Sequence, residues 1–242
     1  TETVEGITKN YHYDYDLSHR LWKVSVDGVL VREYGFDDNG NRTHVDGVLL
    51  GQYDNQDRLT SYAGNNYQYT DNGELRFKTN VSTNQVTEYV YDAFGNLANV
   101  KLPGKDIDYI IDGRSRRVGK KIAGAKVQGF LYADQLNPIA ELDGSNNVVS
   151  QFVYGDKGNV PSYMVKGGDT YRIISDSRGS VRLVVDADTG AVFQQLDYDE
   201  FGNVLNDIAD RLQFFSVGFW NFAVDLITEL FFESHDELHR IQ

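Results

Sequence analysis

The sequence predicts an all-β fold of tandem antiparallel β-hairpins that form a curved, wrapping sheet, followed by a short helical tail. Three observations predict it. A unit of roughly 20 residues recurs along the chain, each copy reads as strand, turn and strand, and the recurrence stops near Ile208. A period of this size gives one supersecondary element per copy, and each copy buries its apolar face only against its neighbours.

The clearest copy is YVYDAFGNL, from Tyr89 to Leu97, and LDYDEFGNV repeats it near the end of the chain. Its nine positions are an aromatic, any residue, an aromatic, Asp, two variable residues, Gly, a polar residue and an aliphatic. Position 3 identifies ten copies, and the residues at that position are Tyr15, Phe36, Tyr53, Tyr69, Tyr91, Ile111, Tyr132, Tyr154, Ser175 and Tyr198.

Each copy is expected to be a hairpin, because positions 1 and 3 point to one face of a strand while Asp and Gly supply turn chemistry. Gly at position 7 in six of ten copies indicates a positive φ there, with His19, Asp57, Ser115 and Leu136 as departures. Asp at position 4 recurs seven times and is interpreted as a turn acceptor, not a catalytic group. The predicted structural positions are Tyr15, Asp16, Tyr53, Asp54, Tyr91, Asp92, Gly95, Tyr154, Gly158, Asp176, Gly179, Tyr198, Asp199 and Gly202.

Ten copies of two strands each give about twenty strands, and an open sheet rarely exceeds about ten before it curls or splits, so the sheet is expected to wrap. Twelve of the 16 tyrosines stand at position 1 or 3. We expect them to stack between adjacent hairpins and supply much of the stability. The alternative is that rows of tyrosine remain exposed and stack on sugars.

The repeat region is predicted to span residues 9–207, with a non-repeat tail over residues 208–242. A stripe of Phe219, Phe222, Leu226 and Leu230 predicts a helix over residues 217–232. Ser234 and Glu237 have the spacing of a capping box that begins a second short helix. Asp225 and Glu229 inside the apolar run argue against a membrane span.

Composition narrows the classes of partner. A net charge of −13 argues against nucleic acid or an anionic membrane as the main partner, since both attract positive surfaces. The chain has no Cys, which excludes disulfides and thiolate metal sites. Because it begins at Thr1, we interpret it as a piece of something longer.

Motifs that carry chemistry are incomplete. His235 and His239 have metal-ligand spacing, but Asp236 stands where the zincin pattern needs Glu. The segment from Asp186 to Gly190 is one residue short of a calcium loop and is interpreted as a hairpin turn. Gly119-Lys120 lacks the rest of a phosphate loop. We therefore expect no enzymatic activity, no cofactor and no metal.

Two further patterns remain open. A basic cluster either binds an anionic polymer or forms the solvated outer face of strands, and its members are Arg114, Arg116, Arg117, Lys120, Lys121 and Lys126. Asn41 and Asn80 begin N-glycosylation sequons, which matter if the source is a secretory eukaryote.

The copies YVYDAFGNL, YGFDDNGNR, YQYTDNGEL and LDYDEFGNV resemble the YD repeat of the RHS family, which includes bacterial Rhs proteins, the C component of insecticidal toxin complexes and the teneurins. The resemblance covers about Lys9 to Asp207. It implies a hollow β-shell that encloses a C-terminal toxin in bacterial members. The family's DPxG cleavage motif has no clear counterpart after Asn206, so self-cleavage is not carried over to this chain.

From the resemblance we expect a structural segment of an RHS-type shell that encapsulates or presents a C-terminal toxin or effector during secreted or contact-dependent delivery, as in interbacterial competition. Its partners would be the rest of a larger RHS protein and its effector, and its location secreted or at a bacterial cell surface. The alternative is an extracellular module that binds glycans or cell-surface proteins through its aromatic repeats.

Overall fold

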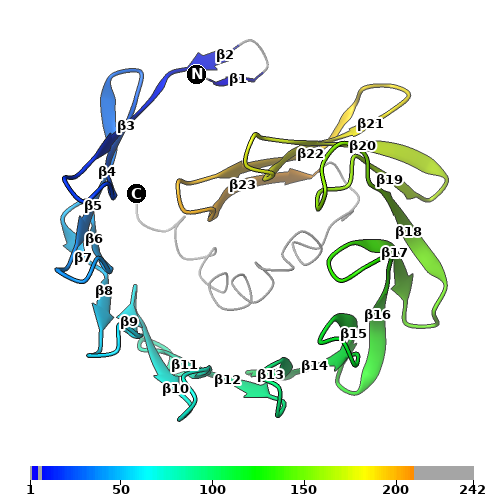
Figure 1. Ribbon diagram of the computed structural model, residues 1–242, viewed down its shortest axis with the longest axis horizontal. Coiled ribbons are helices and arrows are strands. Elements are labelled where there is room, and N and C mark those ends of the chain that lie inside the picture. Colours follow the sequence, from blue (N-terminus) through cyan, green and yellow to red (C-terminus); the bar gives the residue numbers. More distant parts are fainter. Residues whose placement is uncertain (1, 5–6, 210–242) are drawn as a thin grey trace. The chain divides into compact units, whose positions relative to one another are not determined.

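The computed structural model describes residues 2–4 and 7–209 of the chain (Figure 1). Within those residues the backbone forms strands and turns and no helix, and every strand pairs with an antiparallel neighbour along the chain. The predicted all-β class of tandem antiparallel hairpins is therefore confirmed. The helix expected over residues 217–232, the capping box and the His235–His239 pair lie outside the described residues.

The chain divides into two compact units. The first runs up to Val90 and includes Val100–Gly104, and the second comprises Tyr91–Asn99 and the residues from Lys105 onward. The repeat pattern continues through both, so each unit holds several copies of the same hairpin.

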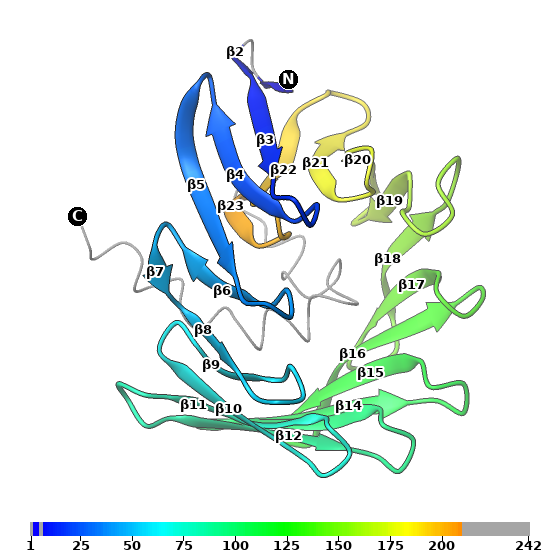
Figure 2. The ribbon, with the colours of Figure 1, turned by 60° about the vertical axis from the view of Figure 1, so that its left-hand side comes forward.

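The first compact unit contains a two-stranded ribbon of β1 and β2 and a five-stranded sheet from β3 to β7 in sequence order. Figure 2 shows β3, β4 and β5 side by side in blue. The strands up to β12 are β1 (Glu2–Val4), β2 (Ile7–Lys9), β3 (Tyr11–Tyr15), β4 (Leu21–Val26), β5 (Val29–Phe36), β6 (Arg42–Val45), β7 (Val48–Leu49), β8 (Gly51–Tyr53), β9 (Leu59–Tyr62), β10 (Asn65–Tyr69), β11 (Leu75–Asn80) and β12 (Val86–Tyr91).

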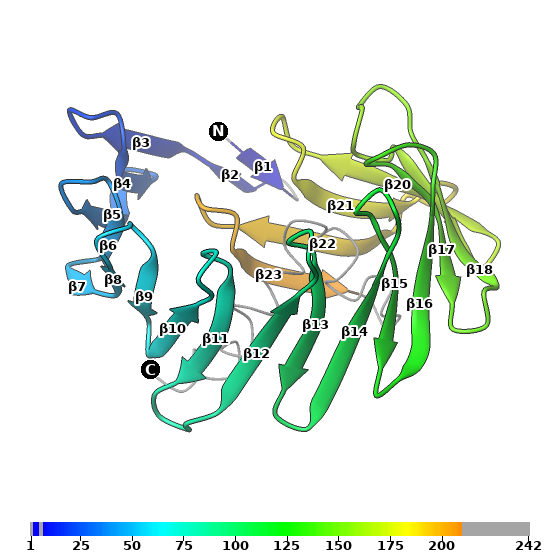
Figure 3. The same cartoon turned by 60° about the horizontal axis from the view of Figure 1, so that its bottom comes forward.

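Strands β8 to β23 follow one another in sequence order in a 16-stranded sheet, which makes it a meander. In the second compact unit β14, β15 and β16 lie side by side (Figure 3), and the strands from β14 to β23 follow a curved path (Figure 1). The remaining strands are β13 (Leu97–Leu102), β14 (Lys105–Ile111), β15 (Arg117–Ile122), β16 (Ala125–Tyr132), β17 (Pro138–Asp143), β18 (Val148–Val153), β19 (Tyr163–Lys166), β20 (Asp169–Ser175), β21 (Val181–Asp186), β22 (Val192–Tyr198) and β23 (Val204–Ala209).

A β-bulge recurs at the same place in the copies. Ile110 pairs with Gly119 while Ile111 pairs with Arg117, so Val118 is an extra residue on the return strand. The register shifts in the same way just before position 3 in seven other copies. A bulge bends its strand and increases the local twist, which accounts for curvature within the second compact unit.

Position 1 of the copies supplies eight of the buried side chains. Tyr89 is 2% exposed and Ile173 is 6% exposed, although Tyr13 in the first copy is 40% exposed. In the second compact unit Ile173 belongs to a buried cluster with Met164 and Val184. Each large apolar side chain buried in this way contributes about 1.5–3 kcal/mol of transfer free energy. The buried residues at position 1 are Tyr34, Tyr67, Tyr89, Tyr109, Phe130, Phe152, Ile173 and Leu196.

Candidate functional site

The turn between positions 4 and 8 has one geometry in most copies. At Asp112 the backbone N–H of Asp112 donates to the Arg116 carbonyl at 3.0 Å, and the N–H of Ser115 donates to the Asp112 carbonyl at 3.0 Å. In eight of the ten copies this turn has a left-handed backbone at position 7. Gly95 has φ 79°, and the non-glycine residues adopt the same conformation, with φ 60° at Ser115, 61° at His19 and 59° at Asp57.

Two copies differ from this geometry, because neither Gly158 nor Leu136 has a positive φ. Gly158 lies in the loop of residues 154–162, whose position 4 is Gly155, so no carboxylate is present there to organise the turn. In the copy that contains Leu136, the carboxylate that accepts the turn N–H groups stands at position 5 instead of position 4. Asp134 accepts the backbone N–H groups of Leu136 and Asn137, both at 2.8 Å.

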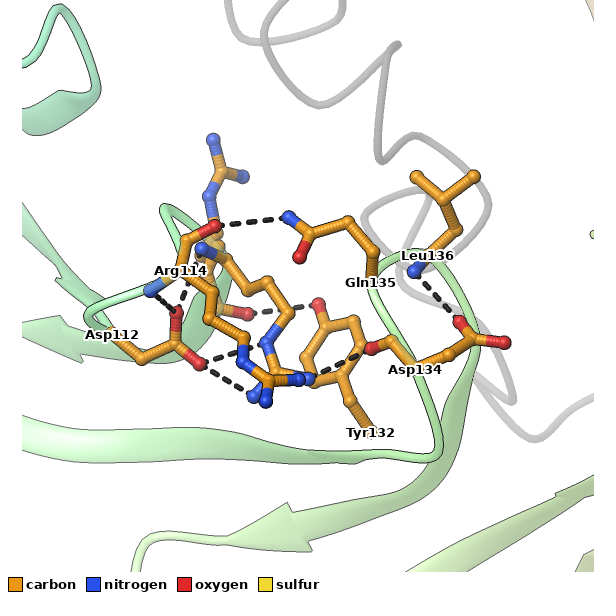
Figure 4. A network of polar contacts seen from close by, with 8 residues as sticks. Asp112, Arg114, Tyr132, Asp134, Gln135 and Leu136 are labelled. Atoms are coloured by element: carbon orange, nitrogen blue, oxygen red, sulfur yellow. Dashed lines mark hydrogen bonds and ion pairs between the residues drawn. The ribbon is translucent and has the colours of Figure 1, made fainter.

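The carboxylate at position 4 closes the turn. The Oδ1 atom of Asp112 accepts the backbone N–H groups of Arg114 at 2.9 Å and Arg116 at 3.0 Å, and its Oδ2 accepts Nε of Arg116 at 2.8 Å (Figure 4). The Arg116 hydrogen bonds lower the pKa of Asp112 to about 2. The carboxylates of Asp16, Asp54, Asp92, Asp176 and Asp199 likewise accept the backbone N–H groups two and four residues later.

In several copies the side chain at position 8 connects the turn to the next copy. Nη1 of Arg116 donates to the carbonyl oxygen of Asp134 at 2.7 Å, and its guanidinium lies 4.9 Å from the ring centre of Tyr132 (Figure 4). The Gln135 amide donates back to the Arg114 carbonyl at 2.9 Å. We call this set of contacts, from the position 4 carboxylate through the position 8 side chain to the next copy, the turn clamp.

The turn clamp recurs in the first compact unit. Arg20 donates to the Asp37 carbonyl at 3.1 Å and lies 4.7 Å from the ring centre of Phe36. Arg58 lies 5.2 Å from the ring centre of Tyr69. In each case Arg at position 8 follows a non-glycine residue at position 7 and covers the position 3 aromatic of the next copy. The pattern therefore joins two consecutive copies through a cation–π contact.

The hydroxyl of the position 3 tyrosine provides a second contact between copies. Tyr132 donates to the Arg117 carbonyl at 3.0 Å, and Tyr154 donates to the Pro138 carbonyl at 3.0 Å. Tyr53 and Tyr69 make the same bond to Arg42 at 3.0 Å and Leu59 at 2.8 Å. Burial raises the pKa of Tyr154 to about 12.

The remaining predicted tyrosines differ in their surroundings. Burial also raises the pKa of Tyr198 to about 12. Tyr91 is half-buried, whereas Tyr15 in the first copy is 59% exposed. A ring that is half-buried and whose hydroxyl is bonded presents little free face to a sugar, so most position 3 tyrosines act as connectors between hairpins.

The loop of residues 154–162 borders a cavity of about 560 Å³ in the second compact unit. Lys157 holds the loop by donating to the carbonyls of Ser175 at 3.4 Å and Asp176 at 3.1 Å. Tyr163, 38% exposed, and Arg172 line the same cavity. The volume falls within the range of small-ligand sites.

Evidence for other chemistry is absent from the part of the chain that the structure describes. No three His, Asp or Glu side chains gather there as metal ligands, and no helix there has the length and apolar character of a membrane span. Asp186 forms a hairpin turn, because its Oδ1 accepts the N–H groups of Asp188 at 3.0 Å and Thr189 at 2.6 Å. In the basic cluster Arg116 belongs to the turn clamp, and the Arg117 guanidinium lies 3.7 Å from the ring centre of Tyr109.

The sequence predicts a turn at Asp143-Gly144 that is not counted among the ten copies, although it has the same geometry. The Asp143 carboxylate accepts the N–H groups of Ser145 and Asn147, both at 2.8 Å, and Asn146 has φ 69°. The signal was present, because Asp143 stands three residues before Asn146 as Asp92 stands three before Gly95. The segment was not recognised as a copy because the residue at its position 1 is Ala140 and not an aromatic.

Comparison with known proteins places this geometry in a family. The family described as Teneurin YD-shell matches residues 1–239. Teneurin-1 of Gallus gallus is 28% identical over 235 residues, which cover 94% of this chain and 8% of that protein. The tRNA3(Ser)-specific nuclease WapA of Bacillus spizizenii is 28% identical over 199 residues, which cover 78% of this chain and 8% of that protein.

Solved structures give a weaker likeness. The TcdB2-TccC3-TEV crystal structure has a TM-score of 0.34 and 12% identity, and the match covers 82% of this chain and 12% of that one. The chain thus spans a small part of each relative. With its repeated turn clamp and the match over nearly its whole length, this chain belongs to the teneurin YD-shell family.

Proposed function

We propose that this chain is a structural segment of an RHS-type β-shell, without enzymatic activity of its own, that encloses or presents a C-terminal effector. The turn clamp is the observation that carries the proposal. Because Arg116 and Tyr132 bond backbone atoms of neighbouring copies, one hairpin can follow another without a separate core for each. A sheet that extends by the addition of similar hairpins can form the wall of a shell.

The relatives support placing the chemistry elsewhere in a longer protein. The relative named as a tRNA-specific nuclease matches this chain over 8% of its own length. A nuclease activity in such a protein need not reside in the matched segment, and the position 4 carboxylates here are occupied by turn N–H groups. We propose that in this protein too the repeat is structural and the effector lies outside it. We also propose that the protein is secreted or located at the cell surface.

Protection of the effector from protease tests the proposal. The full-length protein and the isolated effector are exposed to the same protease, and loss of intact effector is followed over time. We expect the effector in the full-length protein to be cleaved at least ten times more slowly. Cleavage at the rate of the free effector would contradict the proposal. A full-length protein with Arg114→Lys, which changes an exposed side chain, should protect as well as the original.

A second candidate function is an extracellular binding module, and the cavity beside Tyr163 favours it. Arg172 lines the cavity and makes no ion pair or side-chain hydrogen bond among the described residues, so an aromatic ring and a free cation stand together. Binding of acidic oligosaccharides to immobilised protein would be measured with Tyr163→Ala and Arg172→Ala. Loss of binding without loss of thermal stability supports this function. Unchanged binding in both variants, or no binding by the original chain, contradicts it.

A further inference from the structure

The chain contains two N-glycosylation sequons, and both lie in the first compact unit. One is Asn41-Arg42-Thr43 and the other is Asn80-Val81-Ser82. The tripeptide supplies an asparagine whose side-chain nitrogen accepts the sugar and a hydroxyl two residues later. Both tripeptides fit the sequon equally well, but the two asparagine side chains make different hydrogen bonds in the structure.

The nitrogen of Asn41 is fully engaged. Its Nδ2 donates to Oδ2 of Asp37 at 3.1 Å and to Oδ1 of Asp57 at 2.8 Å, so both amide hydrogens have acceptors. The hydroxyl of its sequon also has other partners, because Thr43 Oγ1 lies 3.3 Å from the Gly35 carbonyl and 2.8 Å from His44 Nδ1. A sugar on Asn41 would displace one carboxylate and break the contact between two neighbouring turns.

The nitrogen of Asn80 differs from that of Asn41 in its hydrogen bonds. Its Oδ1 accepts Ser82 N at 3.0 Å, Ser82 Oγ at 2.7 Å and Thr83 N at 3.0 Å, which holds the carboxamide in one orientation. Within residues 2–4 and 7–209, Nδ2 of Asn80 donates no hydrogen bond. The hydroxyl and the asparagine of this sequon are therefore already in contact through Oδ1 of Asn80.

The surroundings of Asn80 give a glycan room. Asn80 ends β11, and the turn of residues 81–85 that follows is exposed throughout, with Val81 55% exposed. Two backbone bonds hold the turn, Asn80 N to the Gln85 carbonyl and Asn84 N to the Asn80 carbonyl, both at 2.9 Å. Neither bond uses the side chain of Asn80, so a sugar there leaves the hairpin intact.

We propose that Asn80 is an N-glycosylation site of the folded chain and that Asn41 is not. The donor is a lipid-linked oligosaccharyl pyrophosphate. The bond between the anomeric carbon and its pyrophosphate oxygen breaks, and a bond from Nδ2 of Asn80 to that carbon forms. The lipid pyrophosphate leaves with the bonding electron pair, and one Nδ2 proton passes to a base. The other Nδ2 hydrogen remains.

The test directs the whole chain into the secretory pathway of a eukaryotic cell and analyses the folded, secreted protein. Peptide mass spectrometry before and after treatment with peptide N-glycosidase measures glycan occupancy at each asparagine. We expect a glycan at Asn80 and none at Asn41. A folded protein that carries no glycan at Asn80, or one that carries a glycan at Asn41, would overturn the proposal.

Matched variants connect the result to the geometry. Ser82→Ala and Asn80→Gln should each remove the whole glycan, and Ser82→Thr should retain it because the hydroxyl remains. Thr43→Val, the corresponding change in the other sequon, should leave occupancy unchanged. If Thr43→Val lowered the glycan content as much as Ser82→Ala, the assignment to Asn80 would be wrong.

Discussion

The guanidinium of Arg116 covers the ring of Tyr132 at 4.9 Å and at the same time binds the Asp134 carbonyl at 2.7 Å. One side chain thus closes its own turn through Asp112 and attaches that turn to the next hairpin. Because Arg20 and Arg58 cover the aromatics of the next copies in the same way, the relationship is a property of the repeat and not of one place.

Arg116→Lys should lower the free energy of unfolding by about 1 kcal/mol, because lysine lacks the planar fork that serves Asp112, Asp134 and Tyr132 together. Arg114→Lys, in the same turn but exposed, should change it by less than about 0.5 kcal/mol. Urea unfolding of both variants measures the difference. Equal effects would show that the turn clamp adds no stability.

Gly95→Ala should destabilise the fold by about 1 kcal/mol through backbone strain alone, since φ is 79° and nothing lies within 4 Å of the added methyl group. Gly113→Ala is the control, because that site is equally open and has no positive φ. Thermal unfolding compares the two, and identical melting temperatures would disprove the requirement for a left-handed residue at position 7.

Ser115→Gly tests the same requirement in the opposite direction. Ser115 has φ 60° and therefore carries conformational strain that glycine does not. Part of the gain is offset by the greater freedom of glycine in the unfolded chain, so we expect a net stabilisation of about 0.5 kcal/mol. A destabilised Ser115→Gly variant in urea unfolding would show that its side chain supplies more than the strain removes.

Stability should fall as the pH drops through the acidic range. The folded pKa of Asp112 is lowered from the ordinary 3.8 to about 2, so its contribution is complete above pH 3.8 and is lost as pH falls through about 2. Asp112→Asn should therefore flatten the acid limb of the stability curve relative to the original chain. Circular dichroism during acid titration follows the change, and parallel curves would contradict this assignment.

Stability should also fall on the alkaline side. Burial raises the pKa of Tyr154 from 10.0 to about 12, so its contribution is complete below pH 10 and is lost as pH rises through about 12. Tyr154→Phe removes the bond to the Pro138 carbonyl at every pH and should make the alkaline loss shallower. Unfolding followed by fluorescence between neutral and alkaline pH measures both effects. A steeper alkaline loss in the variant would refute the role given to burial.

The hairpin repeat was predictable because its turns are local. Asp92 and Gly95 lie three residues apart, and their chemistry closes a turn without help from distant residues. The contacts between copies were not predictable, because Arg116 meets the Asp134 carbonyl 18 residues later and only the folded register brings them together. The bulge at Val118 was missed for the same reason, since pairing with the opposite strand defines it.

In the candidate site, too, the local turn contacts were predictable from the sequence and the contacts between distant residues were not. Position 4 carboxylates were expected to accept turn N–H groups, and those of Asp16 and Asp199 do. The cavity beside Tyr163 was not expected, because it depends on the loop that Lys157 holds against β20. The difference between Asn41 and Asn80 was equally hidden, since it depends on the position of Asp57 in the next copy.

A double-mutant cycle on Arg116 and Tyr132 tests the central claim most directly, namely that neighbouring hairpins are coupled by the turn clamp. Arg116→Met, Tyr132→Leu and the double variant are unfolded in urea, with Arg114→Met and Tyr132→Leu as the control cycle. We predict a coupling energy of about 0.5–1 kcal/mol for Arg116 with Tyr132, and about zero for Arg114. Additive effects in both cycles would contradict the account, because the ring and the guanidinium would then stabilise their own hairpins independently.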